Sequence, residues 1–452
     1  MSINRRGGNR IDTTLYHSTI SFKNKYYYLF LLFFAFTALI DSLNGFLLLS
    51  LNSSFSIGQV VRVITISVLL ILLIRFYNKK INTNNILIMY YLFIIQFYYF
   101  FMNSSTSLSN DLNQIMKIIF IILIIEAYKV LYMRKLINLN SIEKIMSISI
   151  ILYPACIIIP KMLNLGYAMY SSDGVGFSGF FYAANDLNIV LLILLIFALD
   201  NMFIRINRKE KYGIYLISSL LLILSLILLG SKSSAVIGGG IVLIFIVKGI
   251  KDNRANRIKS IFILLMVALV SYFTISTFFQ DEISKALNRH SYFYKNDYVN
   301  GQSFSSFILT NRNTFLDASV TAFSNEENKV SRLLFGVGNH QHMSETGEYL
   351  FKGPKSIEMD FFDVFFSYGI IGILLIYGYL TKIFVKVMFN KNVIKRYFRY
   401  YLGFVILAIY SFLGGHVLFS AMSGTYLALI CSGLLMIYYE LDNSLVVKER
   451  NK

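Results

Sequence analysis

The sequence contains no tryptophan, only three prolines and two cysteines, and only 15% of its 452 residues are charged. The scarcity of charge excludes an ordinary soluble domain, because a chain that is 56% hydrophobic cannot hide so much apolar surface in a soluble core. Cys156 and Cys431 both fall inside apolar runs, where a free cysteine behaves as a small hydrophobic side chain, so no disulfide is expected. The composition instead predicts a polytopic membrane protein.

Apolar runs of about 20 residues, the length that crosses ~30 Å of hydrocarbon as a helix, recur along the whole chain. We therefore predict an all-α membrane protein of about twelve transmembrane helices. The predicted spans are 26–51, 57–77, 85–102, 112–133, 142–162, 184–204, 212–230, 233–248, 259–279, 359–381, 397–417 and 419–440.

The net charge of +18 raises the question of a nucleic-acid partner. Most of the Lys and Arg residues, however, lie in alternate loops, among them "RFYNKK", "RINRKEK" and "KNVIKRYFRYY". This is the distribution that the positive-inside rule predicts, so the charge is a topology signal and no nucleic-acid partner is expected. It places the tails 1–25 and 441–452 in the cytoplasm, and no cleaved signal peptide is expected before the first span.

The same alternation places one large loop, 280–358, outside the membrane, between the spans of 26–279 and those of 359–440. A loop far longer than the usual connection of about 4–6 residues is either functional or disordered. Stretches such as "HSYFYKNDY" favour an ordered loop, because disordered segments are poor in aromatic residues.

Two shorter outside segments carry polar residues at the start of a span. Asn185 and Asp186 begin the sixth predicted span and either cap its helix or face a polar interior. Lys232 lies in the turn "GSKSS", where it either reaches the membrane interface or, with the backbone N–H groups of the next helix, helps to bind an anion.

A group of ionisable residues is predicted on the outer side. Cations, imidazoles and carboxylates together are the groups that a transfer reaction at the membrane surface requires. Asp360 and Asp363 also have a simpler interpretation as complements of a helix dipole, and the two histidines lack a matched third ligand, so no metal site is predicted. The candidate residues are Arg312, His340, His342, Glu358, Asp360 and Asp363.

The order of these features resembles the O-antigen ligase and Wzy-type polysaccharide polymerase superfamily of membrane glycosyltransferases. The resemblance rests on "GFSGFFYAANDLNIV", "LLGSKSSAVIGG", "NRNTFLDA", "LLFGVGN" and "SIEMDFFDVFFSYGIIGILL". It implies a GT-C-like helical fold and a metal-independent, inverting transfer that needs no cofactor. Lys232 stands where the family has Arg, and Glu358 and Met359 stand where ligases have His-Asn, which favours a polymerase.

The implied substrate is an undecaprenyl-diphosphate-linked oligosaccharide, which serves as both donor and acceptor at the outer face of the cell membrane. By this resemblance Arg312 and Lys232 neutralise the leaving diphosphate, and Glu358 or Asp360 accepts the proton of the attacking hydroxyl. The further substrate-binding candidates are Asn185, His340, His342 and Asp363. A chain-length regulator and a flippase are the expected protein partners.

Two other functions stay open. One is an O-antigen-ligase-like transfer of finished glycan to a different acceptor, and the other is a flippase or transporter for lipid-linked oligosaccharide. A transporter is expected to carry polar residues near mid-span. Lys117 and Glu126, inside the fourth predicted span, are the residues that favour it, and their spacing indicates that they do not pair with each other.

We expect Arg312→Ala or Glu358→Gln to abolish polymer while the amount of protein in the membrane stays normal. The check is an immunoblot of the membrane fraction beside a polysaccharide gel. Normal polymer in either variant would remove that residue from the mechanism.

Overall fold

The computed structural model describes residues 25–51, 56–76, 83–102, 107–169, 174–252, 280–293, 309, 312–351 and 353–450. These residues form helices joined by turns, with no strand among them, which confirms the predicted all-α class. The helices are α1 (Lys25–Ala35), α2 (Thr37–Ser50), α3 (Ile57–Arg75), α4 (Thr83–Met102), α5 (Leu108–Met133), α6 (Leu139–Met162), α7 (Ala184–Arg208), α8 (Gly213–Leu229), α9 (Lys232–Asp252), α11 (Gln280–Phe293), α13 (Arg312–Asn325), α14 (Lys329–Phe335), α15 (Asn339–Tyr349), α16 (Asp360–Met388), α17 (Lys391–Arg396), α18 (Phe398–Leu413) and α19 (Ala421–Arg450).

Six described helices are long and apolar enough to cross a membrane, and a seventh span results if α1 and α2, bent by 42°, are taken together. Shorter apolar helices lie within α4, α8 and α18. The protein is therefore a multi-pass membrane protein. The predicted span 259–279 lies outside the described residues. The predicted span 26–51 corresponds to the two helices α1 and α2, and each of the remaining predicted spans overlaps one helix. The total of twelve remains a prediction.

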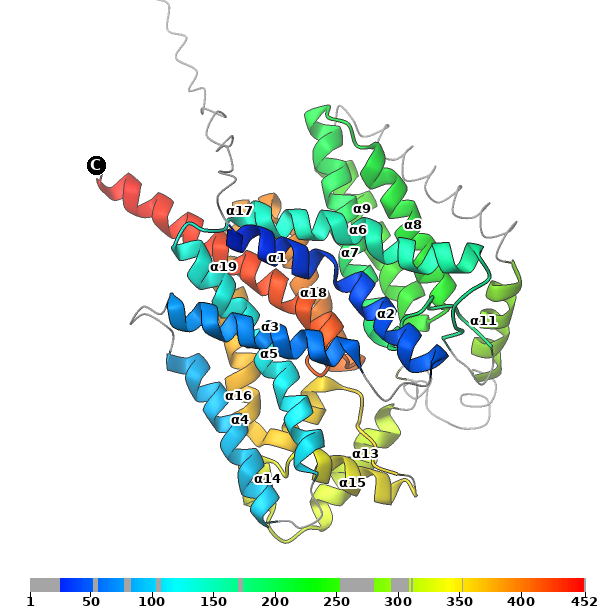
Figure 1. Ribbon diagram of the computed structural model, residues 1–452, viewed down its shortest axis with the longest axis vertical. Helices are drawn as coiled ribbons and strands as arrows, with labels where there is room; N and C mark the ends of the chain where they lie inside the picture. Colours follow the sequence, from blue (N-terminus) through cyan, green and yellow to red (C-terminus); the bar gives the residue numbers. More distant parts are fainter. Residues whose placement is uncertain are drawn as a thin grey trace, which may run out of the picture.

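The centre of the bundle is formed by α5, α7 and α19 (Figure 1). From Leu187 to Leu199 every side chain of α7 is buried, and nearly all are apolar. A helix that is hydrophobic on all sides belongs in a core or a membrane. The outer helices α3 and α4 instead expose large apolar side chains such as Ile74 and Phe101, as expected where helices face lipid.

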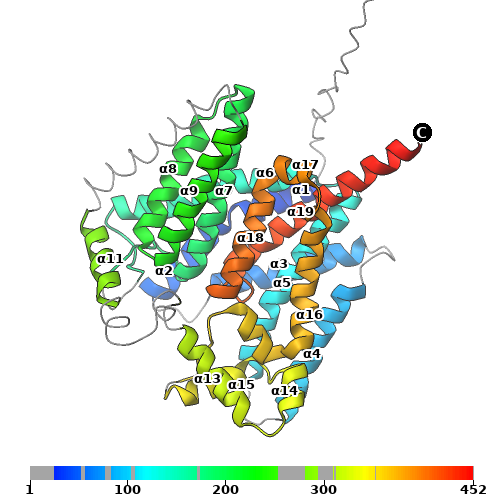
Figure 2. The same ribbon diagram turned by 180° about the vertical axis from the view of Figure 1, so that it is seen from behind.

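Helices α13, α14 and α15, which precede α16 in the chain, gather at one end of the molecule (Figure 1). Figures 1 and 2 show α13, α14, α15 and the first turns of α16 together, far from α17 and the C-terminal end. We call this the polar end. Arg332 of α14 makes a two-pronged ion pair with Glu345 of α15, and Ser319 of α13 lies 2.8 Å from Thr346 of α15, so the three helices form one packed unit.

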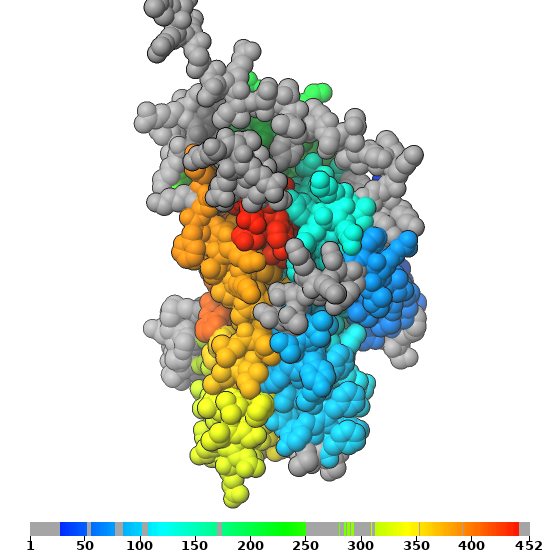
Figure 3. Space-filling model, turned by 90° about the vertical axis from the view of Figure 1, so that its left-hand side faces the viewer, coloured from blue at the N-terminus to red at the C-terminus, as the bar shows by residue number. Residues whose placement is uncertain are grey.

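This unit is joined to the membrane helices by a break in α16 at Gly369, where φ is 66° and ψ is −172°. The turn that follows α14 satisfies the carbonyl groups freed by the break: the N–H groups of Val337 and Gly338 donate to the carbonyl oxygens of Phe366 at 3.0 Å and Ser367 at 2.9 Å. Tyr91 of α4 donates to the carbonyl of Tyr368 at 2.7 Å. Figure 3 shows α4 lying directly beside α14 and α16.

The two backbones meet so closely that neither has room for a side chain. A Cβ atom on Gly369 would lie 2.3 Å from the carbonyl carbon of Leu334, and one on Gly336 would lie 2.3 Å from that of Ser367. Both glycines also have positive φ, a conformation that other residues adopt only with strain. The motifs "LLFGVGN" and "SYGIIG" are therefore the two halves of one contact.

The opposite end of the bundle is held by buried charges. Arg399 of α18 contacts Glu143 of α6 at 2.7 Å and Asp200 of α7 at 3.1 Å, and Lys248 of α9 also pairs with Asp200. Tyr400 donates to Glu143 at 2.7 Å. Four helices are thereby tied together, and each charge lies beside an opposite one, as burial requires.

We expect Gly336→Ala and Gly369→Ala each to destabilise the protein by about 1–3 kcal/mol or more, because the added methyl group meets backbone atoms at a strained φ. The matched control is Gly378→Ala, in the same helix but with open space around its Cβ position; it is expected to be neutral or to stabilise by up to about 1 kcal/mol. Thermal unfolding of purified protein in detergent measures both. A normal melting temperature for Gly369→Ala would contradict the contact.

Candidate functional site

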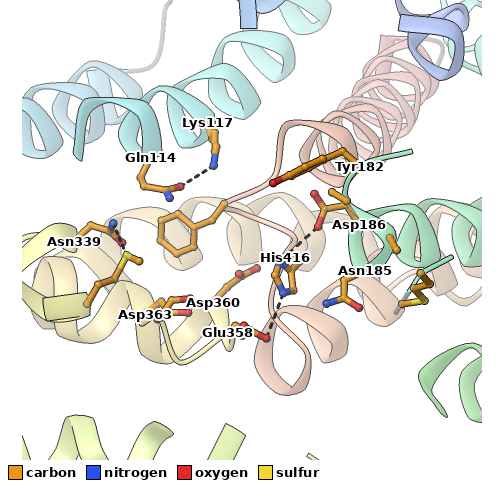
Figure 4. A pocket seen from close by; sticks show the side chains of 16 residues that line it. Gln114, Lys117, Tyr182, Asn185, Asp186, Asn339, Glu358, Asp360, Asp363 and His416 are labelled. Atoms are coloured by element: carbon orange, nitrogen blue, oxygen red, sulfur yellow. Dashed lines mark hydrogen bonds and ion pairs between the residues drawn. The ribbon is translucent and has the colours of Figure 1, made fainter. Parts of the chain in front are cut away.

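A pocket of about 460 Å³ opens among the helix ends beside the polar end (Figure 4). Its lining comes from α5, the start of α7, α15, the start of α16 and the turn between α18 and α19. The structure thus brings together four of the predicted site residues, which are Asn185, Glu358, Asp360 and Asp363. It adds three ionisable residues, Lys117, Asp186 and His416.

Glu358 lies in the segment that leads into α16 and has a positive φ of 61°. Three basic side chains surround its carboxylate: Lys355 donates to Oε1, Arg312 lies 3.5 Å from Oε2, and His416 Nε2 lies 3.8 Å from Oε2. Burial alone would raise the pKa of Glu358, but His416 and Lys355 outweigh it and lower the pKa to about 2. Glu358 is therefore ionised at any physiological pH.

His416 was not among the residues predicted from the sequence. It lies in the turn between α18 and α19, and it too has a positive φ, of 63°. Its Nδ1 is 3.5 Å from Oδ1 of Asp186, and its Nε2 faces Glu358, so the imidazole lies between two carboxylates from different parts of the chain (Figure 4). Burial lowers the pKa of His416, but Glu358, Asp186 and Asp360 together raise it above the ordinary 6.5.

Glu358 and His416 face each other in the pocket, and both have a positive φ although neither is glycine. Such backbone strain persists only where the surrounding structure imposes it. Gly415, the residue before His416, shows how this backbone conformation is imposed. A Cβ atom on Gly415 would lie 2.4 Å from the carbonyl oxygen of Glu358, so the two segments are in backbone contact. The separation of Glu358 and His416 is therefore set by backbone packing.

Asp360, predicted as a catalytic carboxylate, is 1% exposed. Its Oδ2 accepts three hydrogen bonds, from the N–H groups of Val417 and Leu418, both at 2.8 Å, and from the hydroxyl of Ser411 at 3.2 Å. Asp360 therefore holds the turn that carries His416, although it also reaches the pocket lining.

Asp363 has a corresponding role for the segment that carries Glu358. It accepts hydrogen bonds from the N–H groups of Ile357 at 2.9 Å and Met359 at 3.2 Å. His342 lies with Nε2 3.3 Å from Asp363 and stacks on the ring of Phe366. This is more than the helix-dipole effect considered from the sequence, because both carboxylates bind specific backbone groups outside their own helix.

His342 is buried on the far side of Asp363 and is not part of the pocket lining. His340 is likewise outside the lining, and its backbone N–H donates to Asp111 of α5 at 2.6 Å. Within the described residues no group of three His, Cys, Asp or Glu side chains is arranged to hold a metal ion. The two histidines thus belong to the framework around the site.

Lys117 and Glu126 now have partners. Lys117 donates to Gln114 at 2.9 Å and lines the pocket. There it interacts electrostatically with the carboxylates of Asp186 and Asp360. Glu126, deeper in α5, pairs with Lys129 at 3.0 Å and accepts a hydrogen bond from Tyr379 at 3.2 Å. The prediction that they do not pair with each other is confirmed.

The remaining predicted cations lie differently. Arg312, at the start of α13, contacts Glu358 from behind the pocket wall. Lys232 is the first residue of α9 and is not part of the pocket lining. The neighbouring Ser233 accepts hydrogen bonds from Asn188 of α7 at 2.8 Å and Tyr410 of α18 at 2.9 Å, so the "GSKSS" turn fixes the ends of three helices.

The fold and the site define a multi-pass helical membrane protein with a strongly charged pocket among its helix ends. A family model described as O-antigen ligase like membrane protein matches residues 23–297 and 280–441, so the chain belongs to this family. The match confirms the resemblance seen in the motifs and supports a membrane enzyme that processes glycans. No curated protein and no solved structure matches the chain.

We expect Asp360→Ala to destabilise the protein, because it leaves the buried N–H groups of Val417 and Leu418 without an acceptor, at a cost of about 1–3 kcal/mol for each unsatisfied group. Asp360→Asn keeps one acceptor oxygen in place and is expected to retain most of the stability. Melting temperatures of the two variants measure the difference. Equal losses would show that the charge, and not the hydrogen bonding, is what the turn requires.

Proposed function

We propose that the protein is a polysaccharide polymerase that joins lipid-diphosphate-linked oligosaccharide repeat units at the outer face of the cell membrane. The observation that carries the proposal is the pocket, in which cations and carboxylates meet beside the ends of membrane helices. The family match supports the glycan substrate. The proposed topology, with both termini in the cytoplasm and the 280–358 segment outside, rests on the distribution of Lys and Arg.

In the proposed reaction a hydroxyl of one repeat unit attacks the anomeric carbon of another glycan, and the bond from that carbon to the lipid diphosphate breaks. The negative charge that develops on the diphosphate needs cations at fixed positions. Lys117 supplies one in the pocket, and Arg312, which contacts Glu358 from behind the pocket wall, adds positive charge close by. Lys232 remains a candidate for a contact further out.

A ligase-like transfer to a different acceptor is the second candidate, favoured by the description of the matching family. We prefer the polymerase because Glu358 occupies the position of the histidine that ligases usually have. The carboxylate of Glu358 is also held in the site by its contacts with Lys355, Arg312 and His416.

The test is to incubate the purified protein, in lipid, with a defined undecaprenyl-diphosphate-linked repeat unit and to resolve the products on a gel. A ladder of products supports the polymerase. A single product with an added foreign acceptor supports the ligase, and movement of the repeat unit across the bilayer without a new bond contradicts both.

We expect Lys117→Gln to reduce the rate of transfer by about 100-fold, the size of effect seen when one group that stabilises transition-state charge is removed. Lys382→Gln, on an exposed face of α16 away from the pocket, is the matched control and is expected to leave the rate unchanged. Lys232→Gln in the same assay shows whether the "GSKSS" turn contributes. If Lys117→Gln polymerises at the wild-type rate, the diphosphate is held elsewhere.

A further inference from the structure

We propose that His416 is the group that accepts the proton of the attacking hydroxyl, and that Asp360 is the residue that positions it. This inference rests on the proposed function, since it concerns a proton that the glycosyl transfer releases. It replaces Glu358 and Asp360 in the role that the sequence analysis gave them.

The first argument is the geometry of the imidazole. His416 borders the pocket and its side chain is 30% exposed. Its Nε2 atom is itself buried, so Nδ1 is the ring nitrogen left for a hydroxyl group in the pocket. The two ring nitrogens face Asp186 at 3.5 Å and Glu358 at 3.8 Å. These separations are longer than a good hydrogen bond, so neither ring nitrogen is fully engaged by a carboxylate. Such spacing is common in sites whose hydrogen bonds tighten only when substrate binds.

The second argument is that the other acceptors in the pocket are occupied. Glu358 is held by Lys355 and Arg312, whose positive charges favour its ionised form and make it a weak base. Oδ2 of Asp360 already receives three hydrogen bonds, and Asp363 serves the backbone of Ile357 and Met359. Asp186 accepts a hydrogen bond from Ser420.

The charged groups around His416 favour an imidazole that gains a proton during the reaction. Glu358 and Asp186 flank it, Asp360 lies beneath its turn, and the cations Lys355, Arg312 and Lys117 lie beyond these carboxylates. The imidazolium formed in the reaction is stabilised by the nearest charges, which are negative. This is the arrangement in which a carboxylate orients a histidine base.

The step is balanced as follows. The hydroxyl oxygen forms a bond to the anomeric carbon while its proton moves to a neutral nitrogen of His416. The bond between the anomeric carbon and the diphosphate oxygen breaks, and the electron pair leaves with the diphosphate. The imidazolium then releases its proton to water, which restores the neutral base.

Asp360 acts through the backbone. Its bonds to the N–H groups of Val417 and Leu418 fix the residues that directly follow His416, and the contact of Gly415 with Glu358 fixes the residue before it. A histidine at a φ of 63° would otherwise relax to a more common conformation. Asp360 is therefore a positioning residue for His416.

The experiment is a pH profile of the transfer rate, measured with the full-length protein in lipid and the defined repeat unit. The wild-type rate is expected to rise with pH through a value above 6.5, because only the neutral imidazole accepts a proton. Asp186→Asn removes a negative charge that favours the imidazolium. What activity remains in this variant is expected to rise at a lower pH than in the wild type.

His416→Asn is the direct test, because Asn tolerates positive φ better than other non-glycine residues but does not titrate in this range. We expect a loss of about 100-fold to 10,000-fold in rate, the usual contribution of a general base, with an unchanged melting temperature. Lys382→Gln, at an exposed residue of α16 outside the pocket lining, is the control and is expected to keep both rate and pH profile. Asp360→Asn is expected to lower kcat more than it changes KM and to keep the rising limb, because the base is present but less well held.

Three results would overturn the inference: a His416→Asn variant with normal activity, a rate that falls as pH rises through neutrality, or a profile that does not move in Asp186→Asn. Each leaves the proposed function standing, since the wild type still transfers glycan. A wild-type protein that forms no glycosidic bond with any acceptor contradicts the proposed function itself.

Discussion

A single carboxylate oxygen, Oδ2 of Asp360, is the point on which the site depends. It lies at the first residue of α16 and receives hydrogen bonds from residues 411, 417 and 418, which are distant in the sequence. A buried carboxylate is stable only if its oxygens accept hydrogen bonds. Asp360 therefore needs the N–H groups of the turn between α18 and α19, and the turn needs Asp360 as their acceptor. The positions of His416 and Glu358 both follow from this arrangement.

Similar contacts to backbone groups hold the segments around the pocket. Asp363 binds the backbone before α16, Gly415 lets the two pocket segments touch, and the Gly336 and Gly369 pair fixes α14 against the break in α16. Each contact joins backbone to a carboxylate or to other backbone, and none depends on a long flexible side chain. The result is a preorganised pocket in which strain at Glu358 and His416 is maintained by the surrounding framework.

Sequence reasoning located the apolar spans and the carboxylates near residue 358, because hydrophobic length and clustered charge are local signals. It did not show that Asp360 and Asp363 bind backbone groups, since the partners are set by the fold. It missed His416, a lone histidine in a short connection, whose meaning depends on Asp186, more than 200 residues earlier. The sequence also contained Lys117, but its role was not evident, because only the packing of α5 against α19 and α15 makes a charge inside an apolar run part of a pocket.

The ion network around Arg399 has a consequence for how substrate reaches the pocket. Asp200 lies in the same helix as Asp186 but about 21 Å further along it, at 1.5 Å per residue. Separating Arg399 and Lys248 from Asp200 and Glu143 would leave four charged side chains unpaired in a low-dielectric interior, which costs several kcal/mol for each ion. Parting the helices at this end of the bundle would therefore cost these ion pairs, which opposes an approach to the pocket from this end.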